Sequence, residues 1–362
     1  MSKGFKIAYK LGIIAVSILA VIFISSVILV VLDAPILKTF YTICIMPLTR
    51  SLHITEILIR AIPLAITAIG VSVAYRSGII NIGAEGQMAM GILAFTATAL
   101  ALPDVPRPVL LPFAMLMAAL SGGIWGFIPG ILKAKLNVSE LLSTVMLNYI
   151  AAQFYTFCLR VVMMDPAEKM SGGGTPQSMR LTENVWLSRI SGRLHYGIVI
   201  AVVLAVLIYI LLWKTTVGYK MRASGSGARA ARYGGINVPL FVVASMVISG
   251  AFAGLAGGIE IAGVHRRAIE GITNNYGFSA VVVALFGGLH PLGILPASFF
   301  FGLMIYGSTL CPRQVGVPAN IVDVMQGVII LVIVTSQMVL SDKYFQDRLW
   351  RKYQSFKKRK EA

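Results

Sequence analysis

The sequence predicts an all-α membrane protein, a polytopic bundle of about ten transmembrane helices. Hydrophobic residues make up 57% of the 362 residues and charged residues only 12%, about half the share of charged residues found in soluble domains. The mean hydropathy is +0.83. Apolar runs long enough to cross the hydrocarbon core of a bilayer recur along the chain. We therefore expect a single transmembrane domain over residues 1–342.

The apolar runs define the expected elements in order. They cover about 11–32, 55–75, 79–102, 109–131, 139–163, 197–213, 240–262, 277–289, 291–310 and 318–340. The first run is too long for the core of a cleavable signal peptide, so we expect it to remain as an anchor. The run at 277–289 is too short for an upright span and ends at His290-Pro291, which favours two short helices or a broken helix over two full crossings.

Basic residues predict the orientation. Ten crossings place both termini on one side, and Lys and Arg gather in the loops that face the cytoplasm when the N-terminus is cytoplasmic. The inner loop at 214–238 is basic, and a cytoplasmic tail at 343–362 holds the densest basic cluster. The net charge of +17 thus follows the positive-inside rule, and we expect no nucleic acid as partner. The long external loop covers 164–196 and is expected to hold a short helix near Glu183–Ile190.

Two of the apolar runs carry glycine at every fourth position. Small residues at this spacing let helix backbones approach closely where lipid supplies no hydrophobic drive. We expect them to pack helices within the chain, and contact between subunits is the alternative. The glycines are Gly122, Gly126 and Gly130 in one run and Gly250, Gly254 and Gly258 in the other.

Motifs of hydrolytic and nucleotide-binding enzymes are absent from the sequence. There is no Gly-Lys dipeptide, which excludes a phosphate-binding P-loop. The H-E-x-x-H and G-x-S-x-G motifs are also missing. The four histidines are scattered singly, and most are interpreted as solvated interfacial residues. We therefore expect no enzyme activity, no catalytic residue, no bound metal and no cofactor.

Polar side chains within the apolar runs are the candidates for a solute pathway, because such groups are costly in lipid and usually face a bundle interior or a cavity. The densest stretch is Asn81-Ile-Gly-Ala-Glu-Gly-Gln-Met88, where Asn81, Glu85 and Met88 would share one helical face. A structural role for Glu85, capping a helix or pairing with Arg76, is the alternative to lining the pathway.

The expected pathway residues are uncharged amides, hydroxyls and rings with two acidic side chains. Such a set suits a polar ligand that contains a ring, although hydrogen bonding between helices is an alternative role for each residue. The set is Asn81, Glu85, Gln87, Thr144, Asn148, Asn275, Tyr276, Asp323 and Gln326.

The inner loop can form a short surface helix between two spans. Residues Ala228 to Tyr233 have helical character, with arginines at 229 and 232, and Gly234-Gly235 would end the helix. A compact helix in this place is something that a soluble motor subunit could push. A basic loop that only satisfies the positive-inside rule is the alternative.

Several stretches together carry a resemblance to a known family. Arg76-Ser-Gly-Ile-Ile-Asn-Ile-Gly-Ala-Glu-Gly-Gln87 resembles the signature of bacterial ABC-importer permeases of the branched-chain amino acid and simple-sugar type, in their nucleoside-importing branch. Gly218-Tyr-Lys-Met-Arg-Ala and Ala230-Ala-Arg-Tyr-Gly-Gly-Ile-Asn237 are similar to the loop of that family that docks the ATPase. The resemblance covers about residues 55–340.

The resemblance implies a permease subunit that carries nucleosides across the bacterial cytoplasmic membrane without chemistry of its own. Its implied partners are ABC ATPase subunits, a second permease subunit in a heterodimer, and an extracytoplasmic substrate-binding lipoprotein. The implied ATPase-coupling residues are Gly218, Tyr219, Arg222, Arg229, Arg232 and Tyr233.

One departure and two alternatives accompany this resemblance. The family's loop commonly has Val-Gly-x-Asn-x-x-Ala where this chain has Ser224-Gly-Ser-Gly-Ala-Arg-Ala230, which affects the expected docking contacts. The first alternative is an ABC-importer permease of the same kind whose substrate is a monosaccharide such as ribose. The second is an ion-coupled secondary transporter, in which Glu85, Glu140 or Asp323 would carry protons.

Overall fold

The computed structural model describes residues 3–31, 33–171 and 176–341. The basic tail expected at 343–362 lies outside these residues. The chain divides into two compact units, one formed by Arg50–Ile305 and the other by Met1–Thr49 together with Tyr306–Ala362. Helix α13 (Pro291–Gln314) begins in the first unit and ends in the second.

The smaller unit pairs the two ends of the described chain. Helix α1 (Lys3–Val31) packs against α14 (Ala319–Ser341), and the hydroxyl of Tyr9 donates to the carbonyl oxygen of Val339 at 2.8 Å. Along the chain, α1 is followed by α2 (Ile36–Phe40), a π-helical turn (Tyr41–Ile45) and a 3₁₀ turn (Met46–Leu48). The buried core of the smaller unit contains Leu29, Ile43, Cys311, Val317 and Met325.

The larger unit is a helical bundle around α3 (Ser51–Arg76), whose apolar stretch is 89% buried. It continues with α4 (Ala84–Ala101), α5 (Arg107–Leu136), α6 (Glu140–Val161), α7 (Pro166–Ser171), a 3₁₀ turn (Glu183–Val185), β1 (Arg189–Ser191), β2 (Leu194–His195), α8 (Gly197–Lys214), α9 (Thr216–Ser226), α10 (Ala228–Tyr233), α11 (Val238–Glu260), a π-helical turn (Ile261–His265) and α12 (Tyr276–Phe286).

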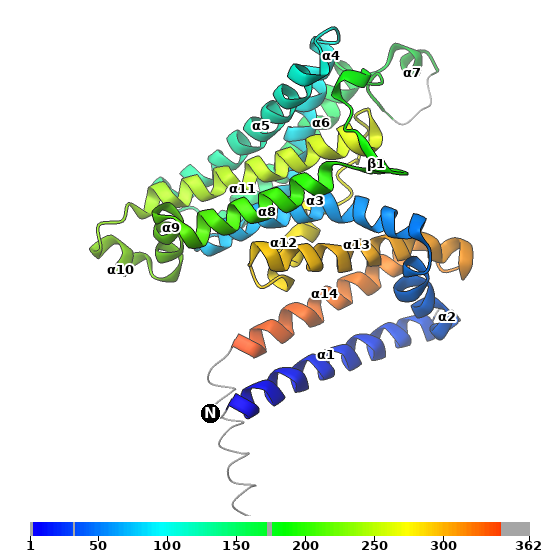
Figure 1. The fold of residues 1–362 in the computed structure, drawn as a ribbon, viewed down its shortest axis with the longest axis vertical. Coiled ribbons are helices and arrows are strands. Elements are labelled where there is room, and N and C mark those ends of the chain that lie inside the picture. Colours follow the sequence, from blue (N-terminus) through cyan, green and yellow to red (C-terminus); the bar gives the residue numbers. More distant parts are fainter. Residues whose placement is uncertain (1–2, 32, 172–175, 342–362) are drawn as a thin grey trace, which may run out of the picture. The chain divides into compact units, whose positions relative to one another are not determined.

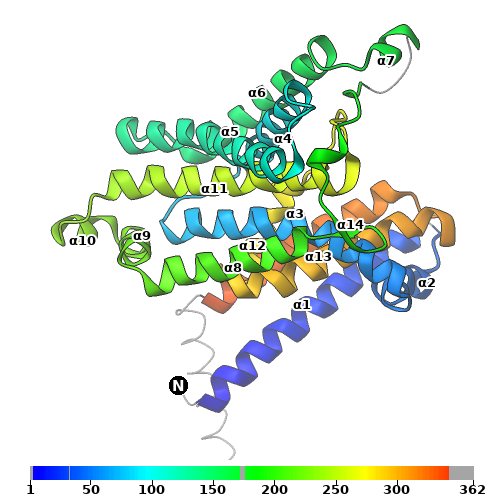
Figure 2. The same cartoon turned by 45° about the horizontal axis from the view of Figure 1, so that its top comes forward.

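Helices α3, α4 and α11 form the centre of this bundle. Helix α5 runs along α11 in both views, and α8 and α12 pack on α3 (Figures 1 and 2). The glycines make the closest approach possible, because a Cβ added at Gly254 would lie 2.2 Å from the carbonyl oxygen of Ala118. One added at Gly122 would lie 2.3 Å from that of Gly250. The prediction that these glycines pack helices within the chain is confirmed.

Six of the described helices are long and apolar enough to cross a membrane, so the fold is that of a multi-pass helical protein. They are α3, α5, α6, α8, α11 with its extension to His265, and α13. Shorter apolar helical stretches cover Ala15–Val31, Ile36–Leu48 and Tyr276–Phe286. About ten crossings and cytoplasmic termini stay predictions.

The start of α4 differs from the prediction. Residues 79–102 read as one helical run, but the helix begins only at Ala84, so Asn81 does not share a helical face with Glu85. Gly78 has a φ of +83°, and the Asn81 side chain accepts a hydrogen bond from the N–H of Gly83 at 2.9 Å. Such a local side-chain bond competes with helix formation, which explains the non-helical segment.

Helices α12 and α13 are separate, but only α12, with 11 residues, is short. Helix α13 has 24 residues and is long enough to cross a membrane, so the expectation of two short helices or a broken helix is wrong for α13. Gly288 and Leu289 adopt positive φ values of 67° and 53° and end α12. The short external helix expected near Glu183–Ile190 is wrong. A 3₁₀ turn covers Glu183–Val185, and the antiparallel pair β1–β2 follows, with Gly192 at φ +56° in its turn. The positive φ of Gly192 suits a hairpin and not a helix.

Candidate functional site

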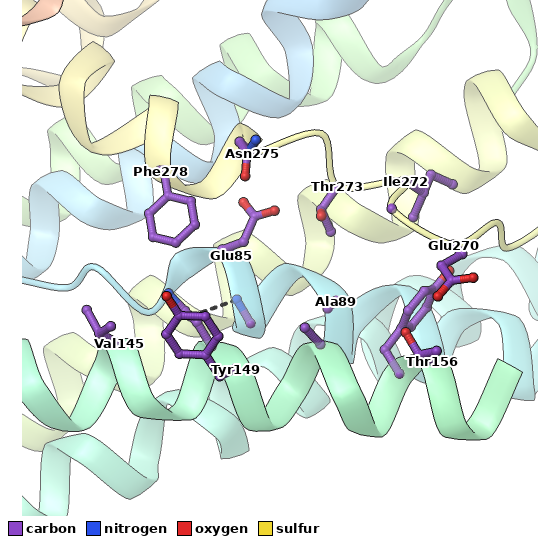
Figure 3. Close-up of a pocket in the computed structure, with 15 residues that line it drawn as sticks. Glu85, Ala89, Val145, Tyr149, Thr156, Glu270, Ile272, Thr273, Asn275 and Phe278 are labelled. Carbon is purple, nitrogen blue, oxygen red and sulfur yellow. Dashed lines mark hydrogen bonds between the residues drawn. The ribbon is translucent and has the colours of Figure 1, made fainter. Parts of the chain in front are cut away.

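A cavity of about 570 Å³ lies between α4, α6 and the segment that leads into α12 (Figure 3). This volume falls in the range of sites that enclose small organic ligands. Apolar contacts come from residues such as Ala89, Val145 and Ile272. Two tyrosines and a phenylalanine add ring surfaces, and the polar groups that converge on the cavity are Glu85, Asn148, Thr156, Glu270, Thr273 and Asn275.

Glu85 caps the start of α12. Its carboxylate accepts a hydrogen bond from the N–H of Gly277 at 2.7 Å. The Thr273 hydroxyl and the N–H groups of Asn275 and Phe278 also face this carboxylate, which Figure 3 shows pointing toward Thr273 and Asn275. The first N–H groups of a helix lack partners within the helix and favour a negative charge. The helix-capping alternative for Glu85 is therefore the one seen, and pairing with Arg76 is not.

Two helix N-termini meet at this cavity. Glu85 lies in the first turn of α4, and its carboxylate binds the first turn of α12. A Cβ added at Gly277 would lie 2.2 Å from the backbone nitrogen of Glu85, so the two helices touch through their backbones. The partial positive charges of both ends are thus directed at the same place. Helix N-termini that point at a site within the membrane are typical of binding sites for polar solutes in transporters.

A buried amide network fixes the segment before α4. The Asn81 amide donates to the Gln87 side chain and to the Ser249 hydroxyl of α11, both at 2.8 Å. From α6, the Asn148 amide donates to the carbonyl oxygen of Ile82 at 3.0 Å. Its oxygen accepts from the N–H of Gly86 at 2.9 Å. The start of α4 is therefore held from two neighbouring helices at once.

The structure divides the predicted pathway residues into three groups. Glu85, Asn148 and Asn275 line the cavity. Asn81, Gln87 and Tyr276 are buried but do not line the cavity, and Thr144 donates to the carbonyl oxygen of Glu140 within its own helix. The side chains of Asp323 and Gln326, on α14, lie outside the described part of the structure.

Several lining residues were missed by the sequence analysis. Tyr149, Tyr155 and Thr156 follow Asn148 along α6 toward the other end of the helix. Together with Val145, Asn148 and Ala152 they recur at intervals of three and four residues, which was a usable signal for one lining face of α6. Glu270, Thr273 and Phe278 come from or next to the segment before α12. No periodicity marks that segment, because it is not helical.

The external loop is fastened to the segment that lines the cavity. Its residues pair with the backbone after α11, and the N–H of Leu181 donates to Arg266 O and that of Ser178 to Ala268 O, both at 2.9 Å. The guanidinium of Arg266 stacks on the ring of Trp186 with its Cζ at 3.8 Å from the ring centroid. A displacement of this loop would therefore reach the segment that lines the cavity.

His195, in strand β2 of this loop, is fully buried and not solvated, contrary to the interpretation of the scattered histidines. Its ring packs on Gly263, where an added Cβ would lie 2.4 Å away. Nδ1 accepts from the N–H of Gly197 at 3.1 Å, so the neutral ring carries its proton on Nε2. Burial lowers the pKa of His195, while the carboxylate of Glu260 acts in the opposite direction.

Three buried or half-buried carboxylates of the described residues lie against a partner. Glu140 pairs with Lys133 at 2.9 Å, and Glu260 lies 3.3 Å from Nε2 of His265. Glu85 binds the start of α12, as described above. A carboxylate that carries protons has to exchange partners during transport. These paired arrangements give the ion-coupled alternative no support at Glu85 or Glu140.

The inner loop forms two short helices, of which α10 confirms the prediction and α9 was not predicted. Helix α10 covers Ala228–Tyr233 and is followed by Gly235 at φ +76°. Tyr219, Arg229, Arg232 and Tyr233 are exposed, Tyr233 at 95% of its surface. Gly218 is buried against α8, and Arg222 points inward, its Nε donating to the carbonyl oxygen of Leu212 at 2.9 Å. The predicted coupling residues thus split into an outer and an inner set.

Comparison with known proteins gives one family. The family model described as the permease component of branched-chain amino acid transport systems matches residues 53–334. This span includes the cavity, the amide network and the inner loop.

Individual relatives agree with this match. The chain is 36% identical to the guanosine ABC transporter permease NupP of Bacillus subtilis, over 79% of this chain and 82% of that protein. It is 34% identical to the nucleoside ABC transporter permease NupB of Lactococcus lactis, over 75% and 76% of the two chains. It is also 31% identical to the glucose ABC transporter permease TsgB13 of Haloferax volcanii, over 89% and 86%.

Proposed function

The chain belongs to the family of permease components of branched-chain amino acid transport systems, and on this premise we propose that it imports nucleosides. It would act as the membrane-spanning subunit of an ATP-binding cassette importer in a bacterial cytoplasmic membrane. The observation that carries the choice of substrate is the cavity between α4, α6 and α12.

The chemistry of the cavity suits a nucleoside. Tyr149 and Phe278 offer ring faces on opposite sides of it (Figure 3), and aromatic faces stack well on nucleobases. Asn148, Thr273 and Asn275 offer amides and a hydroxyl for the hydroxyls of a ribose. Two relatives whose names state guanosine and nucleoside transport support this assignment.

A second permease subunit would complete the cavity. Tyr149 lines the cavity and yet is 67% exposed, and Ile150, Phe154 and Phe157 extend the exposed apolar face of α6. A polar cavity open to lipid would be costly. We therefore assign this face of α6 to the partner permease, which we expect to be a different chain and so to form a heterodimer.

The remaining partners would bind at opposite ends. We assign the exposed residues of α9 and α10 to an ABC ATPase on the cytoplasmic side, with Tyr219, Arg229, Arg232 and Tyr233 as its contacts. A substrate-binding lipoprotein would dock on the external loop at 164–196, which is fastened to the segment that lines the cavity. This arrangement requires both termini to be cytoplasmic, with about ten crossings.

A monosaccharide is the second candidate substrate, because the relative from Haloferax volcanii is named as a glucose permease. The two candidates make different demands on the cavity. A nucleobase needs the ring faces of Tyr149 and Phe278, whereas a sugar relies mainly on hydrogen-bonding groups.

Uptake by cells tests the proposal. Cells that lack this gene and redundant carriers would be complemented with the wild type, Phe278→Leu, or Arg229→Glu/Arg232→Glu, and given radiolabelled uridine, adenosine, guanosine or glucose. We expect the wild type to restore nucleoside uptake, Phe278→Leu to reduce it at least fivefold, and the arginine variant to abolish it while still reaching the membrane. Glucose uptake without nucleoside uptake would replace the substrate assignment with the second candidate.

A further inference from the structure

One turn between α3 and α4 contacts both the inner loop and the half-helix α12. It consists of Arg76, Ser77 and Gly78, and Gly78 adopts a φ of +83° that favours glycine. The turn lies at the C-terminal end of α3, away from the cavity. None of its three residues lines the cavity.

The turn touches α9 through the backbone. A Cβ added at Gly225 of α9 would lie 2.3 Å from the carbonyl oxygen of Arg76 and 2.7 Å from the nitrogen of Gly78. One added at Gly78 would lie 2.9 Å from the Cα of Gly225. No side chain separates the two segments, so a displacement of α9 moves this turn directly.

The side chain of Arg76 holds the other end of α12. Its Nε donates to the carbonyl oxygen of Leu289 and its Nη2 to that of Gly288, both at 3.1 Å. These are the residues with positive φ that follow α12, where carbonyl groups lack partners within the helix. The planar guanidinium is suited to bind two oxygens at once, and a lysine is not.

An aromatic cluster clamps Arg76 against α9. The ring of Trp213 in α8 lies under the guanidinium of Arg76 at 5.3 Å and that of Arg222, in α9, at 5.7 Å. His290 contacts the same ring at a centroid distance of 4.9 Å. Cation–π contacts of this kind are stabilising when partly shielded from water. The cluster therefore joins α8, α9 and the C-terminal end of α12.

The turn also continues into the cavity wall. Residues 79–83 lead from Gly78 to the start of α4, and Asn81 and Asn148 hold this segment through the amide network. At the end of the segment, Glu85 binds the N-terminus of α12. Both ends of α12 are thus connected to the same turn, one through Arg76 and the other through Glu85.

We infer that Arg76 is a positioning residue that transmits movement of α9 to the cavity. When a partner displaces α9 and α10, the Arg76–Gly78 turn moves with Gly225, and it carries along the start of α4 and both ends of α12. Because α4 and α12 form one side of the cavity, its access changes. The inference rests on the proposed function, since it needs an ATPase on α9 and α10.

The test places a single cysteine in the cavity, Val145→Cys, after Cys44, Cys158 and Cys311 have been replaced. The permease would be purified with its ATPase, partner permease and binding protein, and reconstituted in vesicles. The rate of maleimide labelling at position 145 would be compared in the resting complex and in the complex trapped with ATP and vanadate. Nucleoside uptake would be measured in the same vesicles.

We expect trapping to change the labelling rate at least fivefold in the parent and in the control Lys135→Gln, which replaces an exposed basic residue at the C-terminal end of α5. In Arg76→Gln the change should fall below twofold, while the ATPase rate stays within twofold of the parent. Arg76→Lys should retain part of the change, and Trp213→Phe should weaken it.

The outcomes separate the two hypotheses. A full labelling change in Arg76→Gln overturns the inference and leaves the proposed function intact. A parallel loss of assembly, ATPase rate and labelling change in all three variants also overturns it, because Arg76 would then only stabilise the fold. A parent that shows the labelling change but no nucleoside uptake refutes the substrate assignment alone, since the labelling comparison needs no nucleoside.

Discussion

The carboxylate of Glu85 faces two helix starts that pack backbone against backbone. The substitution Glu85→Gln replaces the carboxylate with a neutral amide of the same size. Hydrogen bonds to charged groups contribute about 1.5–3 kcal/mol each, and part of this remains with glutamine. We therefore expect Glu85→Gln to lower the free energy of unfolding by about 1–3 kcal/mol, measured as loss of thermal stability in detergent.

The matched control for this prediction is Glu270→Gln, in the same cavity. Glu270 pairs with Arg160 at 2.9 Å, and the side chains are 31% and 55% exposed, respectively. Exposed ion pairs contribute about 0–1 kcal/mol, so this variant should change stability little. Equal losses in the two variants would show that the position at the helix starts gives Glu85 no special role.

His195 predicts a pH dependence of stability. Because burial lowers its pKa, the unfolded chain binds the proton more readily than the folded one. The contribution of neutral His195 to the free energy of unfolding is then fully present above the pKa of histidine in the unfolded chain, about 6.5. This contribution is lost as the pH falls below that value. Thermal stability of the wild type should decrease from pH 7 to pH 5. His195→Asn keeps an acceptor for the N–H of Gly197 and should flatten this decrease; an unchanged slope would exclude His195 as its source.

At the scale of elements, glycine contacts decide which helices touch. Gly254 of α11 faces α4 and α5 together, where an added Cβ would meet Ala118 O at 2.2 Å. Alanine normally stabilises a helix by about 0.5–1 kcal/mol relative to glycine. We expect Gly254→Ala instead to destabilise the protein, with a lower thermal transition and less protein in the membrane. The added methyl group would collide with the backbone of α5, which cannot move aside as a flexible side chain can.

A second glycine serves as the control, because alanine at this position should not lower the thermal stability. At Gly327 of α14, no atom of the described residues lies within 4 Å of an added Cβ. Gly327→Ala should therefore leave the thermal transition unchanged or raise it. Two variants with equal effects would mean that the close approach of α11 to its neighbours does not limit stability.

The elements that follow local rules could be predicted from the sequence. The apolar runs, the glycine spacing and the short helix α10 all reflect interactions between residues close in the chain. The start of α4 could not be predicted, because the amide of Asn81 finds its partners on α11 as well as nearby. The hairpin β1–β2 was missed for a related reason, since its two strands span only five residues in total.

The cavity was predictable only in part. Asn148 and Glu85 stand out as polar residues in apolar runs, and both line it. Thr273 and Phe278 do not stand out, because the segment before α12 reaches the cavity only through the packing of α12 on α3 and α4. The Trp213 cluster was missed because its members lie on separate elements, and an aromatic residue at a helix end is common in membrane proteins.

At the scale of the larger unit, two connections have a similar form. A non-helical segment links α3 to α4, and another, at 266–275, links α11 to α12. Helix α4 packs on α11, while α12 packs on α3. Such an exchange of neighbours is what two repeats of opposite orientation would produce. The two helix starts that meet at Glu85 are equivalent in this view, which places the cavity at the junction of the repeats.

The number of crossings depends on α12. With 11 residues it is about 16 Å long, roughly half of a hydrocarbon core, so it completes a crossing only together with the non-helical segment at 266–275. We expect α12 to complete a crossing with this segment, because an odd number of crossings would leave the basic tail outside.

The number of crossings is tested with single cysteines at Arg193, Arg229 and Ala362, in a chain without Cys44, Cys158 and Cys311. An impermeant maleimide should label Arg193→Cys on intact cells, and the other two only after permeabilisation. Labelling of Ala362→Cys on intact cells would make the number of crossings odd and α12 a re-entrant helix.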